Sequence, residues 1–153
     1  MINCIRTNSK NQDFQNLVIK LDADLQIRDG DDHVFYAQFN RIAKIKHVII
    51  AYQNDMPVGC GAIKEYAADT MEVKRMYVNE DKRGKGIASR VLNELEHWAL
   101  ELKYKKCLLE TGKNQPEAIG LYKKNGYKIV ANYGQYEKVE NSVCFEKILA
   151  ADK

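Results

Sequence analysis

The sequence predicts an α/β fold, with a single mixed, partly parallel central sheet flanked by helices. Apolar segments of strand length alternate with amphipathic helical segments, and a helix between consecutive strands implies a right-handed crossover and parallel pairing. Strands joined by short turns imply antiparallel pairing elsewhere. At 153 residues and 45% hydrophobic composition, the chain can bury one core but not two comfortable ones. We therefore expect one domain over residues 1–153.

The first part of the chain is expected to hold three strands and one helix. Apolar residues between Phe14 and Leu25 recur at helical spacing, and the acidic segment Asp29–Asp32 ends that helix. A less regular stretch covers residues 34–43, and residues 54–57 have the composition of a turn. The expected strands are Ile2–Arg6, His47–Gln53 and Val58–Tyr66, of which the last two form a hairpin.

A strand followed by a long helix occupies residues 71–102, and the rest of the fold is organised around it. Met71 to Val78 is rich in strand formers and contains no Gly or Pro, and polar residues follow it. From Ile87 to Leu102 the apolar residues follow steps of three and four, which predicts a helix with one buried face.

The loop Asp81–Ala88 between this strand and helix predicts an anion-binding site. Gly84 and Gly86 let a ligand approach the backbone, and the first amides of the helix have no partners within it. The helix N-terminus adds roughly half a positive charge, so a diphosphate would fit there. The basic side chains nearby are Lys82, Arg83, Lys85 and Arg90. A solvated basic turn is the simpler alternative.

Two known phosphate loops can be compared with this segment. The triphosphate-binding loop needs a Gly-Lys-Ser/Thr spacing that the chain lacks. The dinucleotide fingerprint needs a glycine at position 89, where the chain has Ser89, although Glu110 follows as a ribose-binding acid might. A small dinucleotide-binding oxidoreductase is therefore one alternative function.

The last part of the chain is expected to add three strands and a short helix. Pro116 stands where a first helical turn tolerates it, and Asn125–Gly126 is typical of a helix end. The expected strands are Lys106–Thr111, Tyr127–Val130 and Val143–Leu149.

The charge, the cysteines and histidines, and the lengths of the apolar runs argue against a nucleic-acid-binding, metal-binding or membrane protein. The net charge is only +3, and the basic residues gather around residues 82–90. A nucleic-acid groove would need a broader basic face. The cysteines form no Cys-x-x-Cys pair and the histidines are scattered, so we expect no metal and reduced thiols. No apolar run has the length of a signal peptide or membrane span, which predicts a cytoplasmic protein without membrane contact. The cysteines are Cys4, Cys60, Cys107 and Cys144, and the histidines are His33, His47 and His97.

Two stretches together resemble the GNAT superfamily of acetyl-CoA-dependent N-acetyltransferases. The Met-Tyr-Val strand end, the Arg83–Ala88 loop and the following helix are similar to its acetyl-CoA-binding signature. Asn114–Tyr127 is similar to its Asn…Ala…Leu-Tyr…Gly-Tyr segment. The resemblance covers Glu72 to Tyr127 well, and Asp81 departs from the Gln or Arg that the family often has there.

The resemblance implies a binding site for acetyl-CoA as co-substrate. It implies that the strands Glu72–Val78 and Lys106–Thr111 run parallel and splay apart around the pantetheine arm. Strand amides would bind the thioester or pantetheine, loop amides would bind the pyrophosphate, and the asparagine would support the second half of the site. The implied cofactor-binding residues are Met76, Tyr77, Val78, Arg83, Gly84, Lys85, Gly86, Ile87, Ala88 and Asn114.

The resemblance also names two catalytic candidates. Tyr122 matches the tyrosine that protonates the departing thiolate in many family members, although its spacing alone fits a packed aromatic. Glu72 matches the catalytic glutamate of the histone-acetyltransferase branch, although a surface pair with Lys74 or Arg75 is nearly as good an interpretation. Glu110 or a water chain are the alternatives for the base.

The predicted function is direct transfer of an acetyl group to a primary amine of a small molecule or peptide within a ternary complex. No cysteine lies in either motif, which argues against a covalent acetyl-enzyme. A catalytically silent acyl-CoA-binding module is a further alternative. The sequence does not identify the acceptor, and Tyr133, Tyr136 and Asp29–Asp32 are candidates for the wall of the acceptor site. The resemblance also allows a homodimer, because the last strand often takes part in dimers in this family.

Overall fold

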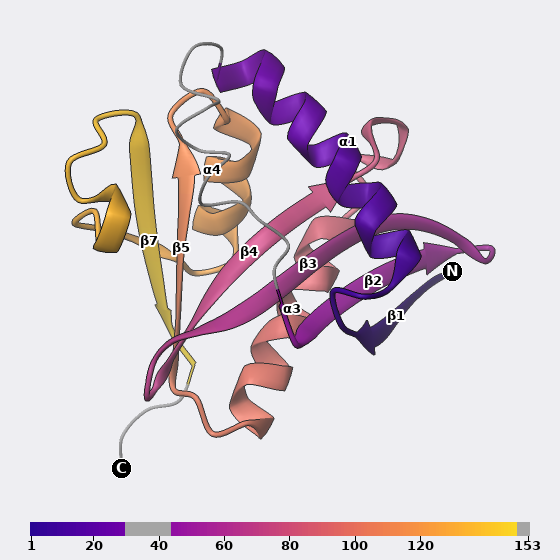
Figure 1. The fold of residues 1–153 in the computed structure, drawn as a ribbon, viewed down its shortest axis with the longest axis horizontal. Helices are drawn as coiled ribbons and strands as arrows, with labels where there is room; N and C mark the ends of the chain where they lie inside the picture. Colours follow the sequence, from indigo (N-terminus) through magenta and orange to yellow (C-terminus); the bar gives the residue numbers. More distant parts are fainter. Residues whose placement is uncertain (30–43, 150–153) are drawn as a thin grey trace.

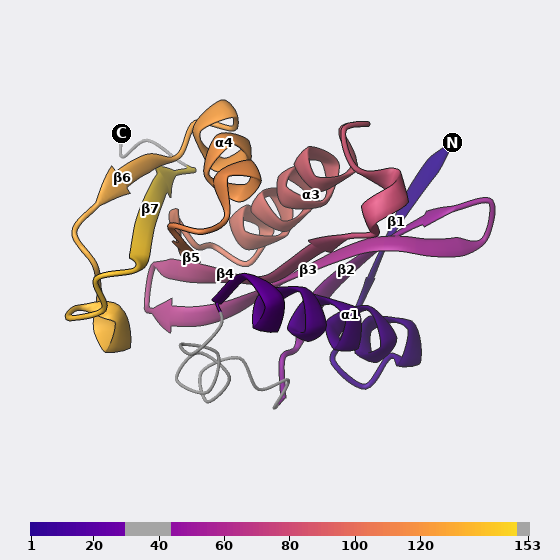
Figure 2. The ribbon, with the colours of Figure 1, turned by 90° about the horizontal axis from the view of Figure 1, so that it is seen from above.

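The structure is a computed structural model and describes residues 1–29 and 44–149. These residues form a seven-stranded sheet in the order β1-β2-β3-β4-β5-β7-β6, with helices on both faces (Figure 1, Figure 2). The predicted mixed, partly parallel sheet is confirmed. The irregular stretch 34–43, His33 and all but the first residue of the acidic segment Asp29–Asp32 lie outside the described residues.

Each predicted strand is present, with ends that differ by one or two residues. Asn54 and Asp55 alone form the β2–β3 turn, because both adopt the positive φ (50° and 65°) that two-residue hairpin turns favour. The following strand therefore begins inside the predicted turn. The strands are β1 Ile2–Thr7, β2 His47–Gln53, β3 Met56–Ala67, β4 Thr70–Val78, β5 Lys106–Gly112, β6 Lys128–Val130 and β7 Ser142–Ile148.

The helices lie on opposite faces of the sheet (Figure 2). Helix α1 (Gln12–Asp29) covers one face, and α3 (Ile87–Glu101) and α4 (Pro116–Lys124) cover the other. Two short 3₁₀ segments, η2 (Glu80–Lys82) and η3 (Gly134–Tyr136), lie in the connections before α3 and before β7. Every predicted helix within the described residues is therefore present.

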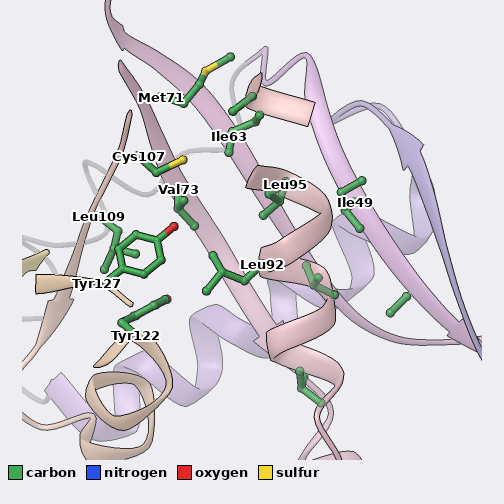
Figure 3. Packing of buried hydrophobic residues seen from close by; sticks show 14 of the residues in the cluster. Ile49, Ile63, Met71, Val73, Leu92, Leu95, Cys107, Leu109, Tyr122 and Tyr127 are labelled. Atoms are coloured by element: carbon green, nitrogen blue, oxygen red, sulfur yellow. The ribbon is translucent and has the colours of Figure 1, made fainter. Parts of the chain in front are cut away.

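Each face of the sheet has its own hydrophobic core. On the α3 face, Leu92 and Leu95 pack near Val73 in a cluster that Figure 3 shows. On the α1 face, Phe14 and Leu17 pack in a second cluster against β2 and β3. Burying one such side chain fully contributes about 1.5–3 kcal/mol, so these two clusters fix both helices against the sheet.

Strands β4 and β5 pair only at their beginnings. Their parallel pairing runs from Thr70 opposite Lys106 to Glu72 opposite Leu108 and stops there. Beyond these residues the two strands diverge, as Figure 1 shows near the label of α4. The parallel, splayed arrangement expected for these strands is confirmed, and it leaves an opening in the middle of the sheet.

A β-bulge in β4 lies at this opening. The register with β3 shifts between Cys60 and Ala62, and Arg75 adopts a φ of 60°, which is rare for a residue other than glycine. Gly61 faces the bulge, where a Cβ atom would overlap the sulfur of Met76. The bulge therefore depends on a glycine in the neighbouring strand that lets Met76 lie close to it.

Candidate active site

A cavity of about 570 Å³ occupies the opening between β4 and β5. Its wall comes from both strands, the loop before α3, the first turn of α3 and the length of α4. Leu21 and Leu25 of α1 line it from the opposite face of the sheet. The cavity therefore connects the two faces, and its volume is typical of small-molecule sites.

The loop before α3 presents unpaired backbone to this cavity. Gly84 and Gly86 have φ of 78° and 83°, and a Cβ atom on either would meet no protein atom within 4 Å. The N-terminus of α3 has no side-chain cap, so the first amides of the helix remain available. This arrangement can bind an anion such as a diphosphate.

The basic side chains of the loop differ in their roles. Arg83 turns back onto the protein: its Nε donates a hydrogen bond of 2.9 Å to the Val78 carbonyl. Its guanidinium also lies 3.6 Å from the Asp24 carboxylate and 5.4 Å from the centre of the Tyr77 ring. The charge of Arg83 is therefore partly compensated by α1, while Lys82 remains in the cavity wall.

The bulge shapes the β4 side of the cavity. Met76, Tyr77 and Val78, which follow it, all line the cavity, and Met76 also packs against the α3-face core. The Arg75 carbonyl accepts a 3.4 Å hydrogen bond from the Cys60 thiol. Backbone distortion at this point can turn strand amides toward a ligand instead of toward the neighbouring strand.

Tyr122 lies at the wall of the cavity on α4. Its ring packs 5.8 Å from Tyr127 and 5.8 Å from Phe145, and Figure 3 shows it beside Tyr127 and Leu109. Burial raises the pKa of the phenol, and the charge of Glu110 raises it further. The ring of Tyr122 therefore packs in the core, and its hydroxyl is protonated at neutral pH.

Glu72 is buried on the α1 face and lines the cavity, with 8% of its surface exposed. Its Oε2 accepts a 2.6 Å hydrogen bond from the Tyr133 hydroxyl, and its Oε1 lies 3.7 Å from the Lys74 ammonium. The pair with Lys74 that the sequence allowed is present, but it is at the cavity and not on an open surface. Arg75 instead pairs with Asp22.

A second carboxylate lies across the opening on β5. Glu110 lines the cavity, and its Oε2 accepts a 2.6 Å hydrogen bond from the Ser142 hydroxyl of β7. Tyr136 lines the same region, and its pKa is raised by burial and then by the charges of Glu110 and Glu72. The partnership with Ser142 has no signal in the sequence, because 32 residues separate the two side chains.

Two of the expected cofactor-binding residues lie apart from the cavity. Lys85 and Asn114 are exposed and do not form part of its wall, whereas the other expected residues do. Gln115, the residue before α4, lines the cavity instead. The sequence could have indicated Gln115 through its position immediately before Pro116, at the N-cap of α4.

The thiols and other side chains offer little further chemistry. Burial raises the pKa of Cys60 and of Cys107 to about 12, so both are protonated at neutral pH. Across residues 1–29 and 44–149, no group of three or more His, Cys, Asp and Glu side chains could hold a metal ion. None of the helices in the same ranges is long and apolar enough to span a membrane.

A sheet opened between two parallel strands, with a helix N-terminus beside the opening, is the architecture of acyl-CoA N-acyltransferases. A crystal structure from Klebsiella pneumoniae, provisionally assigned to that class, is 26% identical with a TM-score of 0.83 over 98% of this chain and 99% of its own. The PaiA N-acetyltransferase of Thermoplasma acidophilum, solved with coenzyme A, has a TM-score of 0.72 at 16% identity over 97% of this chain and 99% of its own.

The sequence comparisons define the family. The profile of the acetyltransferase (GNAT) family matches residues 14–127. An IAA acetyltransferase of Azospirillum brasilense is 32% identical over 94% of this chain and 97% of its own length. The chain belongs to the GNAT acetyltransferase family and is an acyltransferase.

The position at which a dinucleotide loop would have its third glycine is occupied by Ser89. The Ser89 hydroxyl accepts a hydrogen bond from the Asn125 side chain.

Proposed function

We propose that this protein transfers an acetyl group from acetyl-CoA to a primary amine of a small molecule or peptide, within a ternary complex. The observation that carries the proposal is one cavity that joins the glycine loop, the bulged strand β4 and Tyr122. The Thermoplasma acidophilum neighbour was solved with coenzyme A, which supports the same ligand class here.

The glycine loop and β4 would divide the binding of acetyl-CoA between them. The amides from Gly84 to Ala88 would hold the pyrophosphate, because the uncapped α3 N-terminus favours negative charge. Backbone amides near Met76 and Val78 would polarise the thioester carbonyl beside the bulge at Arg75. Lys85 and Asn114 would act only through the backbone or through ligand groups outside the cavity, given their exposure.

Two side chains would move protons in this reaction. Glu72 would take a proton from the acceptor ammonium, directly or through water, so that the neutral amine attacks the thioester carbonyl. As the C–N bond forms and the C–S bond breaks, Tyr122 would give its proton to the departing sulfur. The second proton lost by the nitrogen restores the phenol. The raised pKa of Tyr122 favours the protonated form that this step needs.

Thermal unfolding with acetyl-CoA, coenzyme A or NADH tests the cofactor part of this proposal. A ligand at about one hundred times its Kd should add roughly 2.7 kcal/mol, or about 5–10 °C for a domain of this size. Stabilisation by both coenzyme A species but not by NADH is expected. Stabilisation by NADH alone would overturn the proposal.

Thiol release with an amine panel then tests turnover. Coenzyme A should appear faster in the presence of an accepted amine than by hydrolysis alone, and mass spectrometry should detect the acetylated amine. Binding of acetyl-CoA without transfer to any amine would instead support the silent binding module.

A further inference from the structure

The β4 bulge changes the direction in which Arg75 points. Along a regular strand, successive side chains alternate between the two faces of the sheet. Val73 packs in the α3-face core, and Lys74 on the other face pairs with Glu72. Arg75 would then return to the α3 face, but its guanidinium pairs with Asp22 of α1. The bulge thus places two consecutive cations, Lys74 and Arg75, on the α1 face.

The redirected side chain comes with a strained backbone. Arg75 adopts a φ of 60°, a conformation that is unfavourable for residues with a side chain and that clusters at functional sites. The alternation resumes after the bulge, since Met76 packs against the α3-face core and Tyr77 against the α1-face core. A glycine would adopt this φ without strain. The contacts of the Arg75 side chain must therefore offset the strain.

The guanidinium of Arg75 is buried at the cavity and only partly hydrogen-bonded. Arg75 lines the cavity, and 3% of its side chain is exposed. Its Nη1 donates a 2.9 Å hydrogen bond to Asp22, whereas its buried Nε has no hydrogen-bond partner within the described residues. A buried donor without a partner is unfavourable, and a ligand that supplies an acceptor removes that penalty. Arg75 therefore has an unused donor beside the cavity.

A carboxylate is the ligand group that fits this donor. The Nε–H and a neighbouring Nη–H of a guanidinium form a fork that binds the two oxygens of one carboxylate. Asp22 accepts its hydrogen bond from Nη1, and 46% of its side chain is exposed. Because water solvates this carboxylate, Asp22 can follow a small rotation of the guanidinium that turns Nε toward a bound anion.

Two carboxylates of the same wall are already paired with cations. Glu72 lies 3.7 Å from the Lys74 ammonium. Asp24 lies 3.6 Å from the Arg83 guanidinium. The attraction of each cation offsets much of the repulsion that its carboxylate would exert on an entering anion. An anionic group can therefore approach Arg75 between these two pairs.

Apolar side chains of α1 complete this part of the wall. Leu21 and Leu25 both line the cavity, and residues four apart on a helix lie on the same face. The two leucines thus form one apolar strip beside the guanidinium of Arg75. A ligand here would meet hydrocarbon from α1 and a cation from β4.

We propose that Arg75 binds a carboxylate of the acceptor, and that the acceptor is an amino acid, that is, an amine that also carries a carboxylate. This inference rests on the proposed function and names the substrate class of the same site. Glu72 lies on the same face of β4, three residues before Arg75. With the carboxylate at Arg75, the amino group of the same molecule would face the proposed base.

The first experiment compares each acceptor with its amide on the unaltered protein. Leucine is paired with leucinamide, and 6-aminohexanoate with 6-aminohexanamide, so that the charge changes while the shape is nearly constant. Thiol release with saturating acetyl-CoA gives kcat/KM, referred to the neutral amine because the amide changes the basicity of the amino group. At least one acid should be preferred over its amide at least about 10-fold. Equal use or preference for the amide in both pairs would overturn the assignment.

The second experiment separates recognition from support of the fold. Arg75→Lys keeps a cation for Asp22 but loses the fork, so the KM for the preferred acid should rise at least about 10-fold and the acid-to-amide ratio should fall. Asp22→Asn removes the competing carboxylate, so this KM should stay or fall. An unchanged ratio in Arg75→Lys, or the same rise of KM in both variants, would overturn the role of Arg75.

A matched control tests the loss of an arginine pair elsewhere. Arg6→Lys changes an arginine that pairs with Glu101 outside the cavity wall, and it should alter neither the KM nor the acid-to-amide ratio. Stabilisation by acetyl-CoA should persist in Arg75→Lys, Asp22→Asn and Arg6→Lys. A fall of the ratio in Arg6→Lys equal to that in Arg75→Lys would contradict a specific role of Arg75.

Acetyl-CoA binding separates this proposal from the proposed function. If acetyl-CoA fails to stabilise the unaltered protein, the proposed function itself fails. If acetyl-CoA stabilises the protein and amines are acetylated without preference for an acid over its amide, only the assignment of Arg75 and of the acceptor class fails. The unaltered protein supplies this distinction, so it holds even if Arg75→Lys does not fold.

Discussion

One half of the cavity is lined mainly by backbone and the other half mainly by side chains. The half near α3 consists of backbone: the positive-φ residues Gly84 and Gly86, the uncapped helix start and the strand after the bulge. The half on the α1 face consists of side chains such as Glu72 and Glu110 that come from separate strands. A backbone-built site leaves a contiguous motif in the sequence, whereas a side-chain-built site leaves only scattered residues.

The largest expected effect removes the backbone half. Gly84→Val together with Gly86→Val should abolish stabilisation by acetyl-CoA, because branched side chains would block the loop and disfavour its positive φ. Thermal unfolding with and without acetyl-CoA measures this. The control is Lys85→Ala between them, exposed and outside the cavity wall, which should retain most of the shift. Full stabilisation of the double variant would reject the loop as the pyrophosphate site.

The next effect falls on the chemistry between the two halves. Tyr122→Phe keeps the packing against Tyr127 and Phe145 but removes the proton donor, so kcat should fall about 10²–10⁴-fold with acetyl-CoA binding intact. Steady-state kinetics and thermal shifts give the two values. Tyr104→Phe serves as the control, because Tyr104 is half-buried, lies outside the cavity wall and directs its hydroxyl to Glu65. Undiminished turnover would leave Tyr122 as a packing residue only.

A smaller loss is expected from the carboxylate that would take the proton. Glu72→Gln retains the shape that accepts the Tyr133 hydrogen bond, and kcat should fall about 10²-fold, at the lower end of general base effects. The KM for the amine should change less than kcat, and steady-state kinetics on one accepted amine measure both values. If kcat is unaffected, the base role passes to Glu110 or to a water chain.

The smallest effect concerns buried thiols that lie outside this comparison. The pKa of Cys60 and of Cys107 is raised by burial to about 12 from 9.0. Folding therefore favours the protonated thiols: their contribution is fully present below pH 9 and is lost as pH rises toward 12. Urea unfolding across this range should show a decline that is shallower in Cys60→Ala with Cys107→Ala. An identical slope would contradict this.

Sequence reasoning predicted the elements because their signals are local. The apolar steps from Ile87 predict the α3 face, and Pro116 with Asn125 marks both ends of α4. The glycine loop was found for the same reason, since its residues are adjacent. The insertion of β7 between β5 and β6 has no comparable signal, because β5 and β7 are neighbours in the sheet but are not consecutive strands of the chain.

The parts that could not be predicted depend on tertiary contacts. Arg75 is an arginine at a φ that usually favours glycine, and its bulge is stabilised by Asp22, which lies 53 residues away. Arg83 looked like a phosphate ligand, yet α1 and the Val78 carbonyl hold its side chain. Tyr133 meets Glu72 across 61 residues of sequence. No local pattern encodes such pairs.

The short pairing of β4 with β5 also predicts how the molecule opens. Between Glu72 and the end of β4 no ladder joins the two strands, so the β1–β4 and β5–β7–β6 sections can behave as separate cooperative units with their own local unfolding equilibria. Amides that face the opening should exchange with deuterated solvent faster than those of the central β2–β3 ladder. A ligand that contacts both sections would couple their unfolding equilibria and slow amide exchange in both sections together.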